Sequence, residues 1–495
     1  MAYKHGAYGE VVAEGNPQAI SSANAMVVVG TAPVHLIRGG AKNANKPIVI
    51  ENMAQAKKTF GYSDDWASYT LCMAFKYFFE NKAVGPLVVI DVLDPTVAKS
   101  ADPTTVEKTP SNGKILITSA DSIILDTVEV WTEDDTPVKL VEGTAYTLDY
   151  DPDKKTITLA TIGAGLGTDA LNVKYYTVAP SAVTDTVFIG SSDGMGTNTG
   201  LYAIRNVYPL TGLIPAYLIA PGFSSHPTAH TAMKTVSRQI NGHWDAWIFA
   251  DIPIIDNATP ITLATAKSWK DTNGYTAENE TVYFPMVEGT DSKKYYLSVL
   301  AAANFLELLI ENDDLPYHSA SNTAAKIIRN LYLGDSATGR VYDDEIVNEY
   351  LVKNGICSAV FTSGRWAIWG ACAAGYDQTN GDEINVAETN RMMLYYVSNS
   401  FQARRSVMVD RPLSRNDIQS IVAEEQQRLD ALVGIGALLY GKATIDAEND
   451  SRSDIVKGDW LFDFEVTTTP LAKSLKAKVI WVDTGFAVYF GLDEE

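Results

Sequence analysis

The chain has 495 residues, of which 46% are hydrophobic, and its 60 acidic and 39 basic residues give a net charge of −21 at pH 7. This length exceeds what one hydrophobic core organises, and we expect about two to four domains. The negative charge opposes a phosphate-binding surface, which excludes nucleic acid as an expected partner. Cys72, Cys357 and Cys372 stand in apolar surroundings without CxxC spacing, as is typical of reduced core thiols.

Residues 1–20 predict an extended arm, because Gly15, Asn16 and Pro17 favour a turn and nothing in this stretch can build a core. No basic region followed by an apolar core begins the chain, so we expect no secretory signal. The longest apolar runs, such as 214–220 and 432–439, fall far short of the roughly 20 residues that a membrane span needs. We therefore expect a soluble protein that stays in the cell that made it.

The first core elements follow the arm. The runs AMVVVG at 25–30 and PLVVIDVL at 86–93 predict two buried strands. Between them, large apolar residues from Trp66 to Phe79 recur at helical spacing and predict a helix over 64–81.

The composition changes between residues 101 and 183, where Thr, Asp and Val dominate. Short alternating runs such as 114–117 and 156–159 are separated by turn residues. The pattern predicts a small all-β domain inserted into an α/β one, on the outer face of any assembly.

Strands and helices alternate again over 184–390. We predict a strand beginning at Val187, then a glycine-rich turn and a helix. Further strands are expected at 216–220, 246–250 and 281–286, and helices near 228–240, 260–270 and 293–310, with 366–374 completing the layer. Continuous apolar strands alternating with helices indicate a parallel sheet covered on both faces.

The last hundred residues form another unit. Ser414 and Asp417 have the spacing of a capping box, and apolar residues at helical spacing predict a helix over 417–439. We predict strands at 460–466 and 475–482, and a last apolar strand at 486–490 after a turn.

The clustered glycines Gly190, Gly194, Gly196 and Gly200 match no phosphate-binding motif, and Asp193 among them would repel an anion. We interpret them as a tight turn that needs positive φ.

Two histidines and two carboxylates invite a functional interpretation. Pro227 places His226 before the helix that contains His230, and without HExxH spacing or an adjacent carboxylate we predict no metal site. Asp251 and Asp256 follow a strand at the edge where α/β sheets bind ligands, and we interpret them as turn residues. We predict no catalytic residue and no cofactor.

One segment carries a recognisable signature. Residues 187–223, VFIGSSDGMGTNTGLYAIRNVYPLTGLIPAYLIAPGF, resemble the central pattern of the contractile tail sheath proteins of bacteriophages and related injection machines. Other stretches resemble the same family in the expected order: 3–8, 27–33, 250–253, 283–285, 355–357 and 458–466. Met286 departs from the pattern, which has an aromatic residue there, and 449–454 is unusually polar.

The resemblance covers nearly all of the chain except 101–183. It implies an α/β core with a parallel sheet of subtilisin-like architecture, an inserted all-β domain, and an α+β C-terminal domain with extended terminal arms. The implied divisions are an arm at 1–20, core at 21–100, the β domain at 101–183, core at 184–390, a C-terminal sheath domain at 391–485 and an arm at 486–495.

By this resemblance the protein is a structural subunit and not an enzyme. It would polymerise helically around an inner tail tube and contract to drive the tube through a target cell envelope. The implied partners are further copies of the chain and the tube, baseplate and tail terminator proteins, with no cofactor, no nucleic acid and no membrane contact by the sheath itself. Such a subunit is made and assembled in the bacterial host cytoplasm and resides in a virion or contractile particle.

In such proteins the arms leave their subunit and add as strands to neighbouring subunits. The implied N-terminal arm residues are Tyr3, Lys4, His5, Gly6, Ala7 and Tyr8, and those of the C-terminal arm are Phe486, Ala487, Val488, Tyr489 and Phe490. The candidate face toward the tube is the helix over 417–439, with Asp417, Glu424, Glu425, Arg428 and Asp430.

Two alternatives remain open. A subtilisin-like hydrolase needs His, Asp and Ser side chains that converge. No His-Gly-Thr or Gly-Thr-Ser-Met segment occurs, and neither Ser224-Ser225 nor Ser363-Gly364 has a nucleophile signature. A non-contractile, self-assembling shell protein would also exchange strands, but the lack of an export signal disfavours a surface layer.

Overall fold

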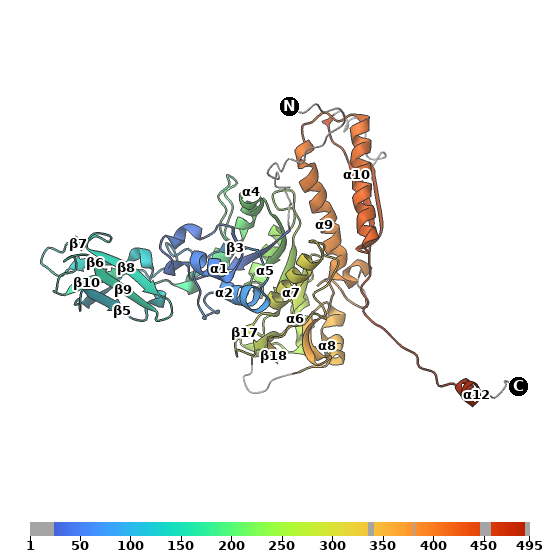
Figure 1. Ribbon diagram of the computed structural model, residues 1–495, viewed down its shortest axis with the longest axis horizontal. Coiled ribbons are helices and arrows are strands. Elements are labelled where there is room, and N and C mark those ends of the chain that lie inside the picture. The colour runs from blue at the N-terminus through green and yellow to red at the C-terminus, as the bar shows by residue number, and fades with distance from the viewer. Residues whose placement is uncertain (1–23, 335–340, 380–381, 446–456, 491–495) are drawn as a thin grey trace, which may run out of the picture. The chain divides into compact units, whose positions relative to one another are not determined.

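The computed structural model describes residues 24–334, 341–379, 382–445 and 457–490. The chain divides into one unit that ends at Ala423 and a second that begins at Glu424 (Figure 1). The first unit contains a mixed α/β core. None of the helices in the described ranges is long and apolar enough to cross a membrane.

A six-stranded sheet with the order β15-β12-β11-β1-β3-β2 forms the centre of the first unit. Its strands are β1 (Asn24–Gly30), β2 (Ile48–Ile50), β3 (Leu87–Asp91), β11 (Ile214–Ile219), β12 (Trp247–Asp251) and β15 (Glu280–Tyr283). All neighbours are parallel except β2, which runs antiparallel to β3. Nearly every residue of the five parallel strands is buried, which confirms the predicted parallel sheet with two covered faces.

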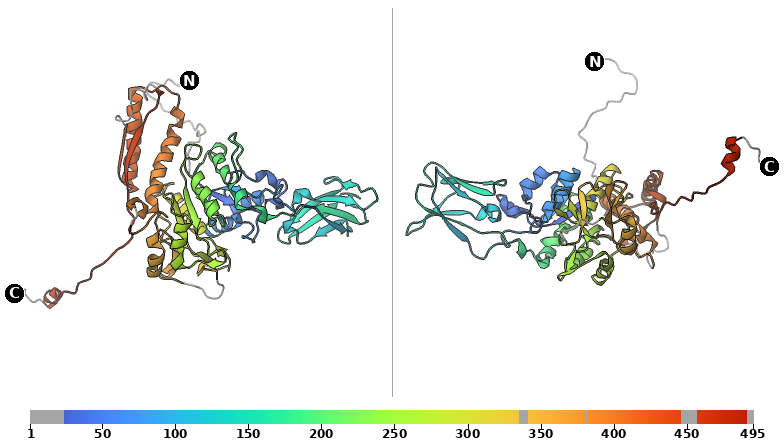
Figure 2. Two further views of the ribbon diagram at one scale, coloured as in Figure 1. Left: turned by 180° about the vertical axis from the view of Figure 1, so that it is seen from behind. Right: turned by 90° about the horizontal axis from the view of Figure 1, so that it is seen from below.

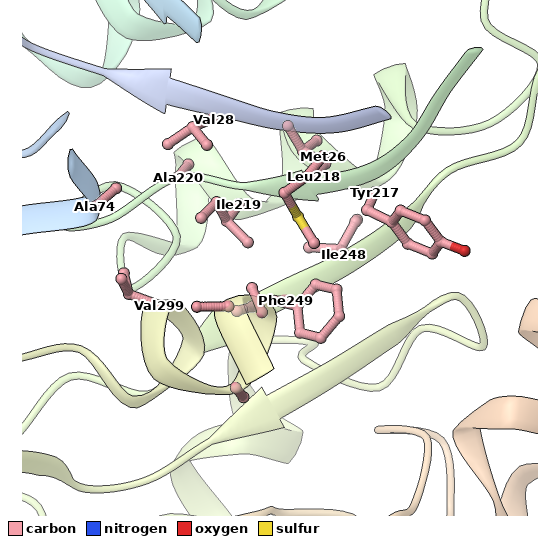
Figure 3. Packing of buried hydrophobic residues seen from close by; sticks show 14 of the residues in the cluster. Met26, Val28, Ala74, Tyr217, Leu218, Ile219, Ala220, Ile248, Phe249 and Val299 are labelled. Atoms are coloured by element: carbon pink, nitrogen blue, oxygen red, sulfur yellow. The ribbon is translucent and has the colours of Figure 1, made fainter. Parts of the chain in front are cut away.

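Helices cover this sheet, which Figure 2 shows from two other sides. They are α1 (Met53–Phe60), α2 (Leu71–Phe75), α5 (Pro227–Val236), α6 (Leu263–Thr272) and α7 (Leu297–Glu311). In Figure 3, Val28, Ile219 and Phe249 follow one another across three strands, and Val299 of α7 lies beside them. Each such side chain contributes about 1.5–3 kcal/mol when it is fully buried.

The helix predicted over 64–81 begins later than expected. It starts at Leu71 and continues in π-helical turns over Lys76–Lys82. Thr70 and Thr31 exchange hydrogen bonds between backbone N–H and side-chain oxygen at 3.1 and 3.2 Å, which ties the preceding segment to the end of β1.

Seven strands between residues 104 and 175 form two further sheets, β4-β10-β6-β7 and β5-β9-β8. They are β4 (Thr104–Lys108), β5 (Lys114–Ile117), β6 (Glu129–Thr132), β7 (Lys139–Leu140), β8 (Tyr146–Asp151), β9 (Thr156–Thr161) and β10 (Leu171–Tyr175). Ile117, Val130, Ile157 and Val173 are buried in a separate hydrophobic core. Val178 and Val183 instead pack in the main core, so the β domain ends before residue 178 and not at the predicted residue 183.

The strand predicted at Val187 is wrong, because α3 (Asp185–Ile189) is a helix. Phe188 is buried and stacks on Phe223 with ring centroids 4.2 Å apart, whereas the neighbouring Val187 is exposed. A strand inside the central sheet would be buried on both faces, whereas this segment buries only one side, as a helical turn does. A 3₁₀-helix (Gly200–Asn206) and α4 (Val207–Thr211) then lead into β11.

The remaining elements of the first unit lie along the chain after β12. They are β13 (Ile255–Asp256), β14 (Thr259–Pro260), β16 (Met286–Gly289), β17 (Lys294–Tyr295), β18 (Ile328–Tyr332), α8 (Asp344–Tyr350), β19 (Ser358–Thr362), β20 (Arg365–Trp369) and α9 (Glu388–Arg405). The strand predicted over 281–286 is divided between β15 and β16, since Pro285 has no N–H for a sheet hydrogen bond.

The last elements are α10 (Arg415–Gly434), β21 (Leu438–Ile445), β22 (Phe462–Thr468) and α12 (Thr484–Phe490). The helix predicted to reach residue 439 therefore ends early. Gly436 has φ +81, its N–H donates to Val433 O at 3.0 Å, and Ala437 N–H donates to Leu432 O at 2.9 Å. These two bonds form a Schellman motif, which ends α10 and starts β21.

Candidate functional site

The N-terminal arm residues Tyr3 to Tyr8 lie outside the described residues. The described residues begin at Asn24, the first residue of β1. The backbone N–H and the side-chain amide of Asn24 both donate to Asp314 Oδ2 at 2.9 Å. Burial raises the pKa of Asp314 to about 6. Asp314 therefore anchors the start of β1.

In the second unit, β21 and β22 form an antiparallel ribbon that pairs Lys442 with Glu465 and Ala443 with Phe464. The second half of α10 packs against β21. Gln426 donates to Gly441 O at 3.0 Å and accepts from Ala443 N–H at 2.8 Å. A Cβ atom on Gly441 would lie 2.7 Å from Leu429, so glycine allows this close approach.

The strands predicted at 475–482 and 486–490 are absent from the described residues of the C-terminal segment. Residues 469–482 have no regular secondary structure, and α12 is a helix. A strand needs a second strand for its backbone hydrogen bonds, whereas a helix finds them within its own segment, as Phe486 N–H does with Asp483 O at 2.9 Å. Val479, Trp481 and Tyr489 are 91%, 77% and 83% exposed.

The candidate tube-facing residues occupy α10. Ser414 and Asp417 form the predicted capping box, in which Ser414 N–H donates to Asp417 Oδ2 at 2.7 Å and Asp417 N–H donates to Ser414 Oγ at 3.3 Å. Asp417, Glu424, Arg428 and Asp430 are exposed. Glu425 differs from these four candidates, because its side chain is buried and its Oε1 lies 4.0 Å from Arg428 Nε.

The glycine-rich turn is confirmed. Gly190, Gly194, Gly196 and Gly200 all have positive φ. Asp193 Oδ1 accepts hydrogen bonds from Met195 N–H at 2.7 Å and Thr197 N–H at 3.0 Å. A carboxylate of the protein therefore occupies the donors that a phosphate would need.

A cleft of about 710 Å3 lies at the carboxyl ends of β1 and β11, and its lining includes Thr31, Trp66, Phe223, His226 and Tyr296. Neighbouring strands connect in opposite directions there, which is where α/β sheets commonly bind ligands. His226 precedes α5, as predicted, and its Nδ1 lies 2.7 Å from Asp185 Oδ1.

Asp251 does more than stabilise a turn. It is buried and accepts hydrogen bonds from Ser298 N–H at 3.0 Å, Ser298 Oγ at 2.5 Å and Ser224 Oγ at 3.3 Å. Burial raises its pKa to about 6. No histidine among the described residues forms a hydrogen bond with Ser224, whose hydroxyl donates to Asp251.

Sequence reasoning missed the partner of His230. The structure brings Glu280 to 2.5 Å from His230 Nε2, with both side chains buried, although the two residues are 50 positions apart. Tyr275 stacks on the imidazole at 3.6 Å between ring centroids. No group of three or more metal-ligating side chains occurs in the described ranges. Glu280 follows the polar residues Glu278 and Asn279, so no local pattern in the sequence marked it as the partner of His230.

The sequence was compared with protein families and with individual known proteins. No family model matches the sequence. The chain is 24% identical over 470 residues to the tail sheath protein of Burkholderia phage BcepMu, and the match covers 90% of this chain and 89% of the phage protein.

Solved structures with a similar fold come from contractile assemblies. A chain of the anti-feeding prophage baseplate matches with a TM-score of 0.55 and 12% identity, over 97% of this chain and 100% of that one. A chain of the PVC sheath complex, an extracellular contractile injection system in its contracted state, matches with a TM-score of 0.54 and 11% identity, over 98% and 100%. The chain is thus similar to a phage tail sheath protein over most of its length and shares its fold with chains of contractile assemblies, which bears out the resemblance to contractile tail sheath proteins.

Proposed function

We propose that this subunit polymerises helically around an inner tail tube, and that contraction of the sheath drives the tube through a target cell envelope. The observation that carries the proposal is the match to a phage tail sheath protein over 90% of the chain. The likeness to a chain from a sheath in its contracted state supports it. No bond-breaking step is required, because two packings of one sequence can differ in free energy.

The C-terminal segment is proposed as an exchange arm. Val479, Trp481 and Tyr489 leave large apolar side chains exposed, and such surfaces mark protein–protein contacts. In a neighbouring subunit the residues from Phe486 to Phe490 would find the strand partner that the isolated chain lacks. Each exchange joins different surfaces, so it propagates as an open helix and does not close as a dimer.

The proposed partners are further copies of the chain, the inner tube protein, and baseplate and tail terminator proteins. Likeness to a chain of the anti-feeding prophage baseplate supports an association with a baseplate. The exposed residues of α10 are the proposed contact with the tube. Assembly in a bacterial cytoplasm, residence in a virion or contractile particle, and the absence of a cofactor, nucleic acid or membrane partner complete this proposal.

We also propose that the core has a subtilisin-like architecture without hydrolase activity. Its support is the parallel order β15-β12-β11-β1-β3 and the geometry around Ser224. The proposed division keeps arms at 1–20 and 486–495, core at 21–100 and 184–390, a β domain at 101–183 and a C-terminal sheath domain at 391–485.

Removal of residues 484–495 tests the arm. We expect the truncated chain to keep the far-ultraviolet circular dichroism of the full chain and to sediment as a monomer, because the core lies elsewhere. A matched chain that lacks only 491–495 loses the acidic end but keeps the aromatic residues, and we expect it to assemble. Tubes from the 484–495 deletion in electron micrographs would contradict the proposed arm.

A further inference from the structure

Two of the three cysteines are in contact. Cys357 directly precedes β19 and Cys372 follows β20, and their Sγ atoms are 3.8 Å apart with both side chains fully buried. The third thiol, Cys72 in α2, instead accepts a hydrogen bond from Ser63 N–H at 3.4 Å. A Cβ atom on Gly370 would lie 3.0 Å from Cys357 Sγ, so glycine leaves room beside this sulfur.

The two thiols lie where the central sheet ends. Cys357 N–H donates to Val282 O at 2.7 Å and Phe284 N–H donates to Cys357 O at 2.9 Å, which pairs Cys357 with the outer strand β15. Ala374 N–H donates to Glu280 O of the same strand at 2.8 Å. The chain segments that contain the two cysteines therefore cover the edge of β15 side by side.

The surroundings of the two sulfurs differ. The buried Lys270 ammonium donates to Asn354 O at 2.8 Å and Ala374 O at 2.6 Å, and it interacts electrostatically with Cys372. Cys372 Sγ donates to Val352 O at 3.6 Å, whereas Cys357 Sγ donates to Cys372 O at 3.8 Å. The hydrogen bond with Cys372 and burial raise the pKa of Cys357.

We propose that Cys357 and Cys372 form a redox modification site, at which a peroxide converts the two thiols into an intrachain disulfide. One thiol of the pair loses its proton and attacks one oxygen of hydrogen peroxide, the O–O bond breaks, and a sulfenic acid and hydroxide form. The hydroxide takes up the lost proton and becomes the first water. The second thiol then attacks the sulfenic sulfur, its proton leaves with the hydroxyl as the second water, and the S–S bond forms. Two thiols are oxidised and one peroxide is reduced to two waters.

Only a small oxidant suits this site, because neither sulfur is exposed to solvent. Hydrogen peroxide is close to water in size, whereas a glutathione disulfide is far larger. The new bond would fasten the two segments that cover β15, and so it would stabilise this edge of the sheet against opening.

The test treats the full-length protein with hydrogen peroxide, alkylates remaining thiols under denaturing conditions, and maps tryptic peptides by mass spectrometry. Cleavage after Lys353, Arg365 and Arg391 places the cysteines on separate peptides, 354–365 and 366–391. We expect these peptides to be linked in the wild type and in Cys72→Ala, and to separate on reduction. The midpoint of thermal unfolding should rise by about 2 °C on oxidation and return on reduction.

Cys372→Ala is the matched variant, and it should form no linked peptide and show no shift of the midpoint. Peroxide treatment that leaves both thiols intact would overturn the proposal. The same holds if sulfinic or sulfonic acids form without a link, or if Cys72 is oxidised before the pair.

Discussion

At the scale of single residues, Asp251 holds three elements together. It ends β12, accepts the Ser298 N–H in the first turn of α7, and accepts the Ser224 hydroxyl from the loop after β11. Asp251→Ala leaves buried donors without acceptors, which costs about 1–3 kcal/mol per donor. We expect a lower midpoint of denaturant unfolding for this variant, and Ser225→Ala serves as a neighbouring control.

The same carboxyl predicts a pH dependence. Burial raises the pKa of Asp251 to about 6, above the ordinary value of 3.8, so the folded state binds its proton more readily than the unfolded state. The contribution of Asp251 to the free energy of unfolding therefore increases as the pH falls from about 6 to 4. Above about pH 6 this contribution does not change with pH. Asp251→Asn has no proton to gain. Relative to this variant, the wild type should become more stable between pH 7 and pH 4.5, as measured by denaturant midpoints; equal changes in both proteins would contradict the assignment.

Contacts between distant residues explain what the sequence could not predict. Asp314 and Asn24 are 290 positions apart, and His230 and Glu280 are 50 apart. No local pattern marks either pair, because the sheet and not the spacing brings them together. The capping box of Ser414 and the positive φ of Gly190 depend on neighbouring residues, and both were predictable.

At the scale of elements, the parallel strands were predictable because a strand buried on both faces has a continuous apolar run. The same signal misled at 187–189 and 486–490, where short apolar runs form helices. These runs are too short to distinguish the two structures, because three to five apolar residues fit a helical turn as well as a strand. Among the described residues of the second unit, β21 pairs with β22, and no strand pairs with residues 475–490.

The β domain offers a test at this scale. Lys99 and Val178 form an antiparallel bridge, and Ser100 N–H donates to Thr177 O at 2.8 Å, so the two ends of the domain lie side by side. A chain that lacks 101–176, with a short glycine linker, should keep the core circular dichroism and still assemble. Loss of the core spectrum would show that the domain is needed for folding.

That deletion also removes contacts between the domain and the core. Arg38 donates to Leu125 O at 2.6 Å and to Glu142 at 2.5 Å and lies 3.5 Å from Asp126, and it loses all three partners. His35 Nε2 loses its hydrogen bond with Asp121 O, which is 3.0 Å long. Arg38→Ala in the full chain is the control that separates this loss from the loss of the domain. Because the pair with Glu142 is partly exposed, we expect the substitution alone to cost about 1 kcal/mol or less from that pair.

At the scale of the whole molecule, the net charge of −21 makes copies of the chain repel one another. In the proposed sheath, specific contacts through the proposed arms would have to overcome this repulsion. Salt screens exposed charges over about 8–10 Å near physiological ionic strength, so higher salt should favour assembly.

Negative-stain electron microscopy of the purified full-length protein at several salt concentrations tests the central claim most directly. A sheath subunit should form wide helical tubes, and more of them as the salt concentration rises. Single particles of one subunit at every salt concentration, even with the inner tube protein added, would contradict an assembling sheath.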